Sequence, residues 1–170
     1  MNGGIRHRAG HTLPELLTIL GIAAVLATAA VPVFSSLLLD SRMNAVLASA
    51  MHAVNLGRQF SATRGETIRL CGSVDARECS GAPDWSAGLL LADDAGLFHQ
   101  TLGFSGGPGT PRLRSNRATL SFEAGSGFAT PATIVICDRR GARAARAVIV
   151  SRAGRPRTST RDGSDRALTC

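Results

Sequence analysis

An apolar stretch near the N-terminus constrains the fold more than any other feature of this sequence. No Asp, Glu, Lys or Arg occurs from Leu16 to Phe34, and a helix needs about 20 apolar residues to cross the bilayer core. A basic leader ending at Gly10 precedes the stretch, and the one acidic residue of the apolar segment, Glu15, lies at its start, directly before Leu16. A secretory signal peptide carries its small residues at the far end of the apolar run instead. The sequence therefore predicts a membrane-spanning helix behind a short leader.

The residues around this leader resemble the prepilin leader of type IV pilins and pseudopilins, which has Gly, usually Phe-Thr-Leu-x-Glu, and then an apolar helix. The matching residues here are Gly10, Thr12, Leu13 and Glu15, with His11 where Phe is usual. The resemblance implies that a prepilin peptidase cleaves the chain between Gly10 and His11. Cleavage would make His11 the new N-terminal residue, whose amine the family methylates. It also implies that Glu15 pairs with the amine of a neighbouring subunit. The alternative is an ordinary membrane anchor, in which an isolated carboxylate costs about 2.5–3.5 kcal/mol.

The apolar helix is expected to continue as an amphipathic helix. Apolar residues recur at spacings of three and four, which places them on one helical face; they are Met43, Val46, Leu47, Ala50, Met51 and Val54. The sequence therefore predicts one long helix from about residue 13 to 63. The predicted segments are a leader (1–10), a transmembrane or filament-core helix (11–35), an amphipathic second half (36–64) and a β domain (65–170).

Short segments with β character follow the helix, separated by Gly-rich and Pro-rich loops. The expected strands are residues 67–71, 85–92, 118–122, 133–137 and 145–150, and a turn is expected at Ala153-Gly154 before an Arg-rich C-terminal tail. Closely spaced strands with short turns are typical of an antiparallel sheet. The predicted fold is therefore α+β and pilin-like, with a long N-terminal helix packed on an antiparallel sheet.

The four cysteines are expected to form disulfides, because an even count behind an export signal favours them. Four cysteines allow three pairings. The favoured one joins Cys71 to Cys79 across a local loop and Cys137 to Cys170, which ties the tail to a strand. A zinc site is not favoured, since the sequence has no Cys-x-x-Cys and its four histidines are scattered.

Three longer pieces of sequence narrow the resemblance to the GspH/FimT family of minor pilins and pseudopilins. They are Leu70-Cys71…Cys79…Asp84-Trp85-Ser-x-Gly88, Ile136-Cys137-Asp138-x-Arg-Gly141 and Ala147-Val-Ile-Val-Ser151-x-x-Gly154-Arg155. Membership would imply a single-pass inner-membrane protein with a periplasmic C-terminal domain. Its partners would be other minor and major pilins.

Positive charge is concentrated in the C-terminal third. All 19 basic residues are arginines, and from Arg112 onward twelve arginines face four acidic residues, a net of +8, against −1 before it. A high-GC genome would explain the choice of arginine over lysine but not this clustering. Arginine suits bidentate contact with phosphate, and a basic block attracts polyanions.

The most informative part of this block is Gly154-Arg155-Pro156-Arg157, which matches the Gly-Arg-x-Arg element by which FimT-type minor pilins bind DNA. Arg152 and Arg161 extend the patch. Glycine permits a tight turn, and proline restricts the backbone between the two arginines. The alternative is a solvated basic turn that serves solubility or contact with another pilin.

Nothing in the sequence favours an enzyme, a cofactor or a metal site. The Gly-rich segment 103–109 lacks the lysine of a phosphate-binding loop. The sequence is therefore interpreted as a minor type IV pilin that contributes to pilus assembly. It would bind extracellular double-stranded DNA, without sequence preference, for natural transformation. The alternative is a structural GspH-type pseudopilin of a type II secretion system with no DNA role.

Overall fold

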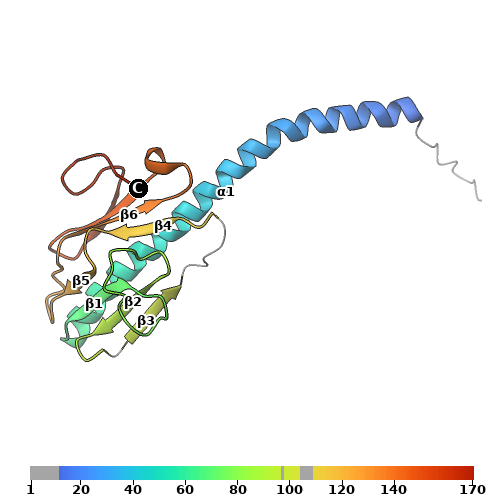
Figure 1. Cartoon of the computed structure of the whole chain (residues 1–170). Helices are drawn as coiled ribbons and strands as arrows, with labels where there is room; N and C mark the ends of the chain where they lie inside the picture. Colours follow the sequence, from blue (N-terminus) through green and yellow to red (C-terminus); the bar gives the residue numbers. More distant parts are fainter. Residues whose placement is uncertain (1–11, 97, 104–108) are drawn as a thin grey trace, which may run out of the picture. The chain divides into compact units, whose positions relative to one another are not determined.

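In the part of the chain that the structure describes, one long helix is followed by eight short strands (Figure 1). The structure, a computed structural model, describes residues 12–96, 98–103 and 109–170. Helix α1 spans Leu13–Arg64, close to the predicted bounds. The strands are β1 (Ile68–Gly72), β2 (Gly88–Asp93), β3 (Phe98–Gly103), β4 (Arg112–Ser115), β5 (Thr119–Phe122), β6 (Ala132–Cys137), β7 (Arg146–Val150) and β8 (Pro156–Ser159), with a short 3-10 helix, η1 (Gly141–Arg143), between β6 and β7.

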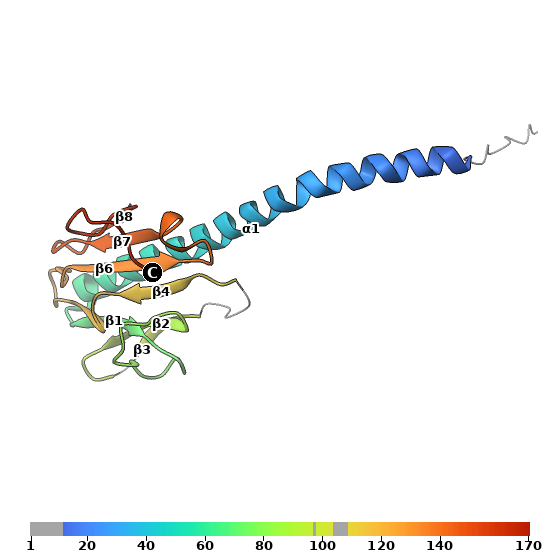
Figure 2. The ribbon, with the colours of Figure 1, turned by 45° about the horizontal axis from the view of Figure 1, so that its top comes forward.

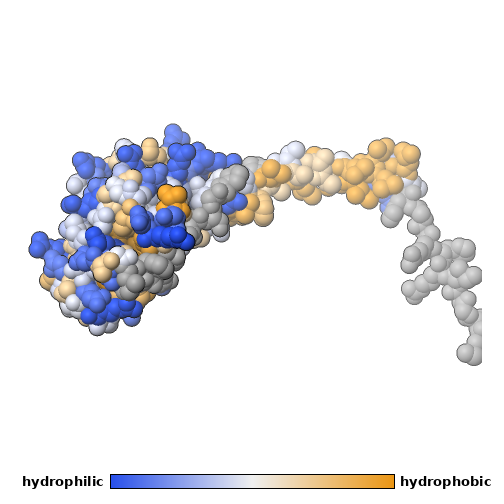
Figure 3. Space-filling view, turned by 60° about the horizontal axis from the view of Figure 1, so that its bottom comes forward, coloured by the Kyte–Doolittle hydropathy of each residue, from blue (hydrophilic) through white to orange (hydrophobic). Residues whose placement is uncertain are grey.

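The chain divides after Leu38 into two compact units. The described part of the first unit is the apolar beginning of α1, whose large side chains are exposed, for example Leu17 at 61% and Val25 at 70%. Figure 3 shows this part of α1 coloured mostly as hydrophobic. By length and composition this part of α1 is suited to crossing a membrane.

The second unit, Leu39–Cys170, has its own hydrophobic core. Residues buried on α1 recur every three or four positions, as the amphipathic pattern predicts; they are Leu39, Met43, Val46, Ala50, Ala53 and Val54. Gly57 continues this face, and a methyl group there would lie 2.5 Å from the ring of Phe122. The absence of a side chain at Gly57 thus lets the helix pack closely against the strands.

The strands form two antiparallel sheets of four (Figure 2). The first has the order β3-β2-β1-β5 and the second β4-β6-β7-β8. One core cluster joins α1 to both sheets, and its strand residues include Leu70, Leu91 and Phe122 from the first sheet and Ile134 and Val148 from the second. The predicted α+β fold, a long helix packed on antiparallel strands, is therefore confirmed, with the β domain divided into two sheets.

Three strands escaped the sequence patterns, and all three lie at sheet edges: β3, β4 and β8. Edge position alone is not the reason, since β5 is also an edge strand and its pattern was recognised; β4 and β8 are only four residues long and carry arginines, so their strand signal is weak. In β8, Pro156 begins the strand, a position where its missing N–H breaks no ladder. The segment expected to be an Arg-rich tail therefore begins as a strand.

Candidate nucleic-acid interface

The basic motif lies in the tight connection between β7 and β8. Val150 pairs with Pro156, and the intervening residues close the hairpin. The backbone N–H of Ser151 donates to the carbonyl of Arg155 (3.1 Å), and the N–H of Gly154 donates to the carbonyl of Ser151 (2.9 Å). The Ser151 hydroxyl adds a bond to the Arg155 carbonyl (3.3 Å). Both ends of the turn are therefore held in place by hydrogen bonds.

Gly154 allows this turn to pack closely against the rest of the domain. Its φ of +69° lies in the left-handed region, where glycine alone carries no steric penalty. A methyl group here would overlap the carbonyl oxygen of Gly127 and lie 3.0 Å from Cδ of Arg58 on α1. The neighbouring Arg152 carbonyl accepts a hydrogen bond from Ala129 N–H (2.8 Å). The turn is thus seated on α1 and on the loop before Ala129.

Three arginines on this hairpin are exposed: Arg152, Arg155 and Arg157. In the antiparallel pairing of β7 with β8, Arg157 lies opposite Ile149. Residues opposite one another on neighbouring strands share a face of the sheet, so Arg157 and Ile149 lie on the same face. Within the described part of the chain, the guanidinium groups of these three arginines have no acidic partner. Their charge is therefore available to a ligand.

Arg161 and Arg166 differ from these three because each has an acidic neighbour. Arg161 Nε lies 3.7 Å from Asp165 Oδ1, and Arg166 Nε donates to Asp162 Oδ2 at 2.8 Å. The backbone N–H of Arg166 is the main reason that the pKa of Asp162 lies below its ordinary value. Of the predicted DNA-binding residues, Arg161 is thus the one whose charge is partly compensated.

The C-terminal segment, residues 160–170, covers the face of the second sheet on which Ile149 lies. Leu168 packs with Ala145 and Ala147, and a disulfide joins Cys170 to Cys137 at the end of β6. A cavity of about 600 Å³ remains beneath the segment. Its lining carries Arg114 and Arg166 but also Asp162, so it is less uniformly basic than the hairpin.

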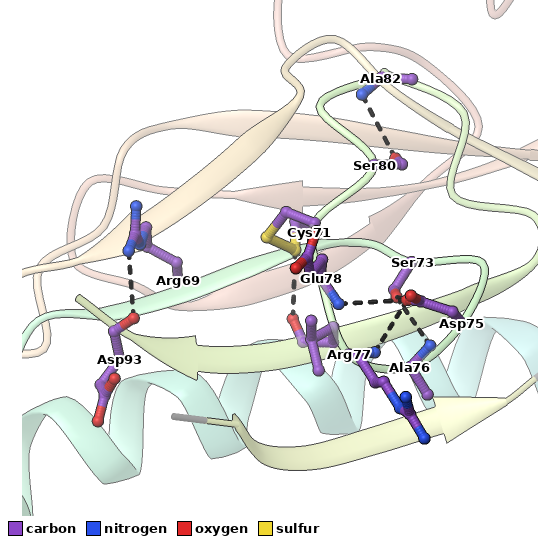
Figure 4. The surroundings of a disulfide bond; sticks show 12 residues. Arg69, Cys71, Ser73, Asp75, Ala76, Arg77, Glu78, Ser80, Ala82 and Asp93 are labelled. Atoms are coloured by element: carbon purple, nitrogen blue, oxygen red, sulfur yellow. Dashed lines mark hydrogen bonds between the residues drawn. A yellow bond between two sulfur atoms is a disulfide. The ribbon is translucent and has the colours of Figure 1, made fainter. Parts of the chain in front are cut away.

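The second disulfide, Cys71–Cys79, closes the loop after β1, as the favoured pairing predicted. Figure 4 shows how Asp75 organises this loop: its carboxylate accepts hydrogen bonds from the N–H groups of Arg77 (3.0 Å) and Glu78 (3.2 Å). These backbone bonds, with that of Arg77 the largest, lower the pKa of Asp75. Among the residues described, no group of three or more potential ligands could hold a metal ion.

The predicted residues of leader processing lie elsewhere in the chain. Gly10 and His11 are outside the described residues. Glu15 is in the first turn of α1, where the helix dipole favours an acidic side chain.

Comparison with known families gives a match over residues 48–154 to the model described as "Type II transport protein GspH". The chain belongs to the GspH family. This family comprises minor pilins and pseudopilins, which are structural rather than catalytic proteins. A search of curated proteins found no match for the chain.

Two crystal structures of the type IV minor pilin FimU from Pseudomonas aeruginosa share the fold of this GspH-family chain. One is 19% identical with a TM-score of 0.53, covering 77% of this chain and 98% of FimU. The other is 20% identical with a TM-score of 0.55, covering 80% and 97%. At this level of identity the likeness concerns the fold, and it confirms the pilin-like architecture.

The GspH match ends at Gly154. It therefore includes the glycine that seats the hairpin turn and stops just before Arg155 and Arg157. The structure also reveals a residue that sequence reasoning missed: Arg58 of α1, almost a hundred positions away, lies directly beneath Gly154. No local signal marks Arg58, because its place beside the turn arises only from the packing of α1 against the second sheet.

The Asp138-x-Arg140 part of the sequence pattern that resembles the GspH/FimT family forms an ion pair in the structure. The buried carboxylate of Asp138 accepts hydrogen bonds from Arg140 Nε (2.9 Å) and Nη2 (2.7 Å). Arg140 Nη1 also donates to Asp40 of α1 (2.7 Å). Burial opposes ionisation of Asp138, but the bonds from Arg140 outweigh it and hold the pKa of Asp138 below its ordinary value. This cluster ties the β6–β7 connection to the helix.

Proposed function

We propose that this protein is a minor type IV pilin that binds double-stranded DNA through the β7–β8 turn. The observation that carries the proposal is the exposure of Arg155 and Arg157, without acidic partners among the described residues, on a turn held by Gly154. Such arginines contact phosphate readily, because the planar guanidinium matches the geometry of its oxygens. The physiological role proposed is capture of extracellular DNA for natural transformation.

The proposed mode of binding is contact with the phosphate backbone. The chain has no Tyr, and its one tryptophan, Trp85, is fully buried, so neither residue type supplies a surface on which bases could stack. Phosphate contacts position a protein on DNA without reading sequence. We therefore expect binding to be weak, independent of sequence and strongly dependent on salt.

The remaining parts of the proposal concern assembly. We propose that a prepilin peptidase removes residues 1–10 and that the chain is held in the inner membrane by the beginning of α1. The domain from Leu39 would then face the periplasm. Glu15 would pair with the amine of a neighbouring pilin, and the partners would be other minor and major pilins.

The test is a titration of a mixed-sequence duplex with the purified full-length protein in neutral detergent, over a series of salt concentrations. Each arginine–phosphate contact contributes about 0.9 to the slope of log affinity against log salt. Arg155→Ala combined with Arg157→Ala should therefore weaken binding and reduce the slope by about 2. The fold should stay intact because both side chains are exposed. Replacement of both by Glu should weaken binding further.

A matched control is Arg139→Ala combined with Arg143→Ala. These two arginines are also exposed and lie in the connection that precedes β7, whereas the basic turn follows β7. The control removes the same charge, so it should leave the slope nearly unchanged if position matters. If the Arg155/Arg157 variant binds with the affinity and slope of the unmodified protein, the turn is not the site.

The description of the matching family model, a type II transport protein, favours a second candidate function. In that case the chain is a structural pseudopilin of a type II secretion system. The unmodified protein would then show no DNA binding even at low salt. Co-purification with secretion-system pseudopilins rather than with pilus subunits would support this second candidate.

A further inference from the structure

We infer that Arg58 of α1 is an additional phosphate-binding residue, so that the DNA-contact surface combines the end of the helix with the β7–β8 turn. This inference rests on the proposed function. It goes beyond that function because it assigns a role to a helix residue that lies outside the Arg-rich C-terminal block.

The first support is the position of the Arg58 side chain. A methyl group at Gly154 would lie 3.0 Å from Cδ and 3.3 Å from Cγ of Arg58, and one at Gly127 would lie 3.0 Å from its Cγ. The aliphatic stem of Arg58 therefore runs beneath both glycines. Its guanidinium group is bonded to Cδ, so the charge lies within two bonds of an atom that nearly touches the turn.

The second support is the charge of Arg58. Its side chain is half-buried, and among the described residues its guanidinium has no hydrogen-bonded or ion-paired acid. Arginine can pack its aliphatic stem along the protein while its charged head reaches water, and a guanidinium without an acidic partner can contact a phosphate bidentately. An anion bound at the turn would supply that partner, and a DNA phosphate held by Arg155 is such an anion.

The third support is the site's place on the domain. At 1.5 Å per residue, Arg58 lies about 28 Å along α1 from Leu39, where the domain begins. In Figure 2 the turn after β7 lies at the same end of the domain as the end of α1. The helix and the hairpin thus present their arginines at one end of the domain, where a rod-like polyanion can lie across both.

The test compares two substitutions at Arg58 in the full-length protein in neutral detergent. Arg58→Met keeps an apolar stem of similar reach but removes the charge, whereas Arg58→Lys keeps the charge. We expect Arg58→Met to lower the affinity for a mixed-sequence duplex and to reduce the salt slope by about 0.9, and Arg58→Lys to retain most of the slope. The matched control, Arg77→Met, removes an exposed arginine from the disulfide loop and should change neither quantity.

Thermal unfolding of the same variants separates charge from packing. Because methionine replaces the stem, Arg58→Met should unfold near the temperature of the unmodified protein, so its weaker binding cannot be attributed to a displaced turn. An unchanged salt slope in Arg58→Met, together with a reduced slope in the Arg155/Arg157 double variant, would overturn this inference and leave the proposed function standing. Absence of DNA binding by the unmodified protein would overturn both.

Discussion

Gly154 occupies a position where a methyl group does not fit. Its left-handed backbone favours glycine, and the carbonyl oxygen of Gly127 and the stem of Arg58 fill the space where a side chain would stand. The same residue therefore lets the hairpin turn lie directly against Gly127 and Arg58. Its role is steric, whereas the roles proposed for the arginines are electrostatic.

We expect Gly154→Ala to destabilise the domain by about 2–4 kcal/mol, the combined cost of a left-handed non-glycine residue and of overpacking. Thermal unfolding measures this effect. The control is Gly81→Ala, because Gly81 has a nearly identical φ of +68° but open space around it. The control should lose only the backbone part, and equal losses in the two variants would show that the contact with Gly127 and Arg58 carries no weight.

A second prediction concerns Asp138 and pH. Hydrogen bonds from Arg140 hold the pKa of Asp138 below 3.8, its ordinary value, although burial opposes this. The stability from ionised Asp138 is therefore fully present above about pH 4 and is lost as pH falls through the lower folded-state pKa. Asp138→Asn should lower the free energy of unfolding at pH 7 by about 1.5–3 kcal/mol. It should also flatten the loss of stability below pH 4.

The comparison for Asp138 is Asp94→Asn, which breaks the ion pair of Asp94 with Arg69 at 3.3 Å. The Asp94 side chain is 67% exposed, and exposed pairs contribute little. Unfolding curves at several pH values distinguish the two variants. A similar acid limb in Asp138→Asn and in the unmodified protein would contradict the assigned role of Asp138.

Two links outside the strand pairing hold the second sheet to its neighbouring elements. Arg140 links Asp40 of α1 to the β6–β7 connection across a hundred positions of sequence, and Cys170 links the C-terminal segment to β6. These two links act on opposite faces of the second sheet: one on the helix side, the other on the side that the C-terminal segment covers. The hairpin that carries Arg155 extends from the sheet that they brace.

The two disulfides should contribute unequally to stability. The Cys137–Cys170 bond spans a sequence separation of 33 and the Cys71–Cys79 bond one of 8, and loop-closure entropy grows with loop length. We expect Cys137→Ser with Cys170→Ser to cost roughly 4 kcal/mol, and the other pair roughly 2.5 kcal/mol. Peptide mapping without reduction checks the pairing, and any other pairing, or four free thiols in periplasmic material, would contradict it.

At the level of the whole molecule, the apolar beginning of α1 and the domain from Leu39 have separate tasks. The first unit exposes its apolar side chains along its described length, while the second buries its own core. A membrane or the apolar helices of neighbouring subunits would cover the first unit. The second would remain in water with its arginines accessible.

A final prediction concerns assembly through Glu15. We expect Glu15→Ala to leave the protein in the membrane, because the apolar run is unchanged, but to reduce its co-purification with other pilins. Glu123→Ala, which removes an exposed carboxylate of the domain, is the control and should assemble normally. Unaltered co-purification of Glu15→Ala would rule out the pairing.

Intact-mass analysis of the same material should place the mature N-terminus at His11.

Local sequence patterns were sufficient for the long helix, the apolar anchor, the four central strands and the edge strand β5. The anchor depends on the length of its uncharged apolar run, and the others depend on a periodicity within a few turns or residues, from which the burial of Met43, Val46 and Ala50 follows directly. The disulfide pairing was also predictable, since one pair closes a local loop and leaves the other two cysteines to each other.

Only the tertiary structure decided the division into two sheets, three of the four edge strands (β3, β4 and β8) and the neighbours of the basic turn. Of these strands, β4 and β8 are four residues long and contain arginines, so their own sequence gives a weak strand signal. The contact of Arg58 with Gly154 and the bond of Arg140 to Asp40 join residues almost a hundred positions apart. No local pattern encodes such pairs, because they form only when α1 and the second sheet pack on a common core.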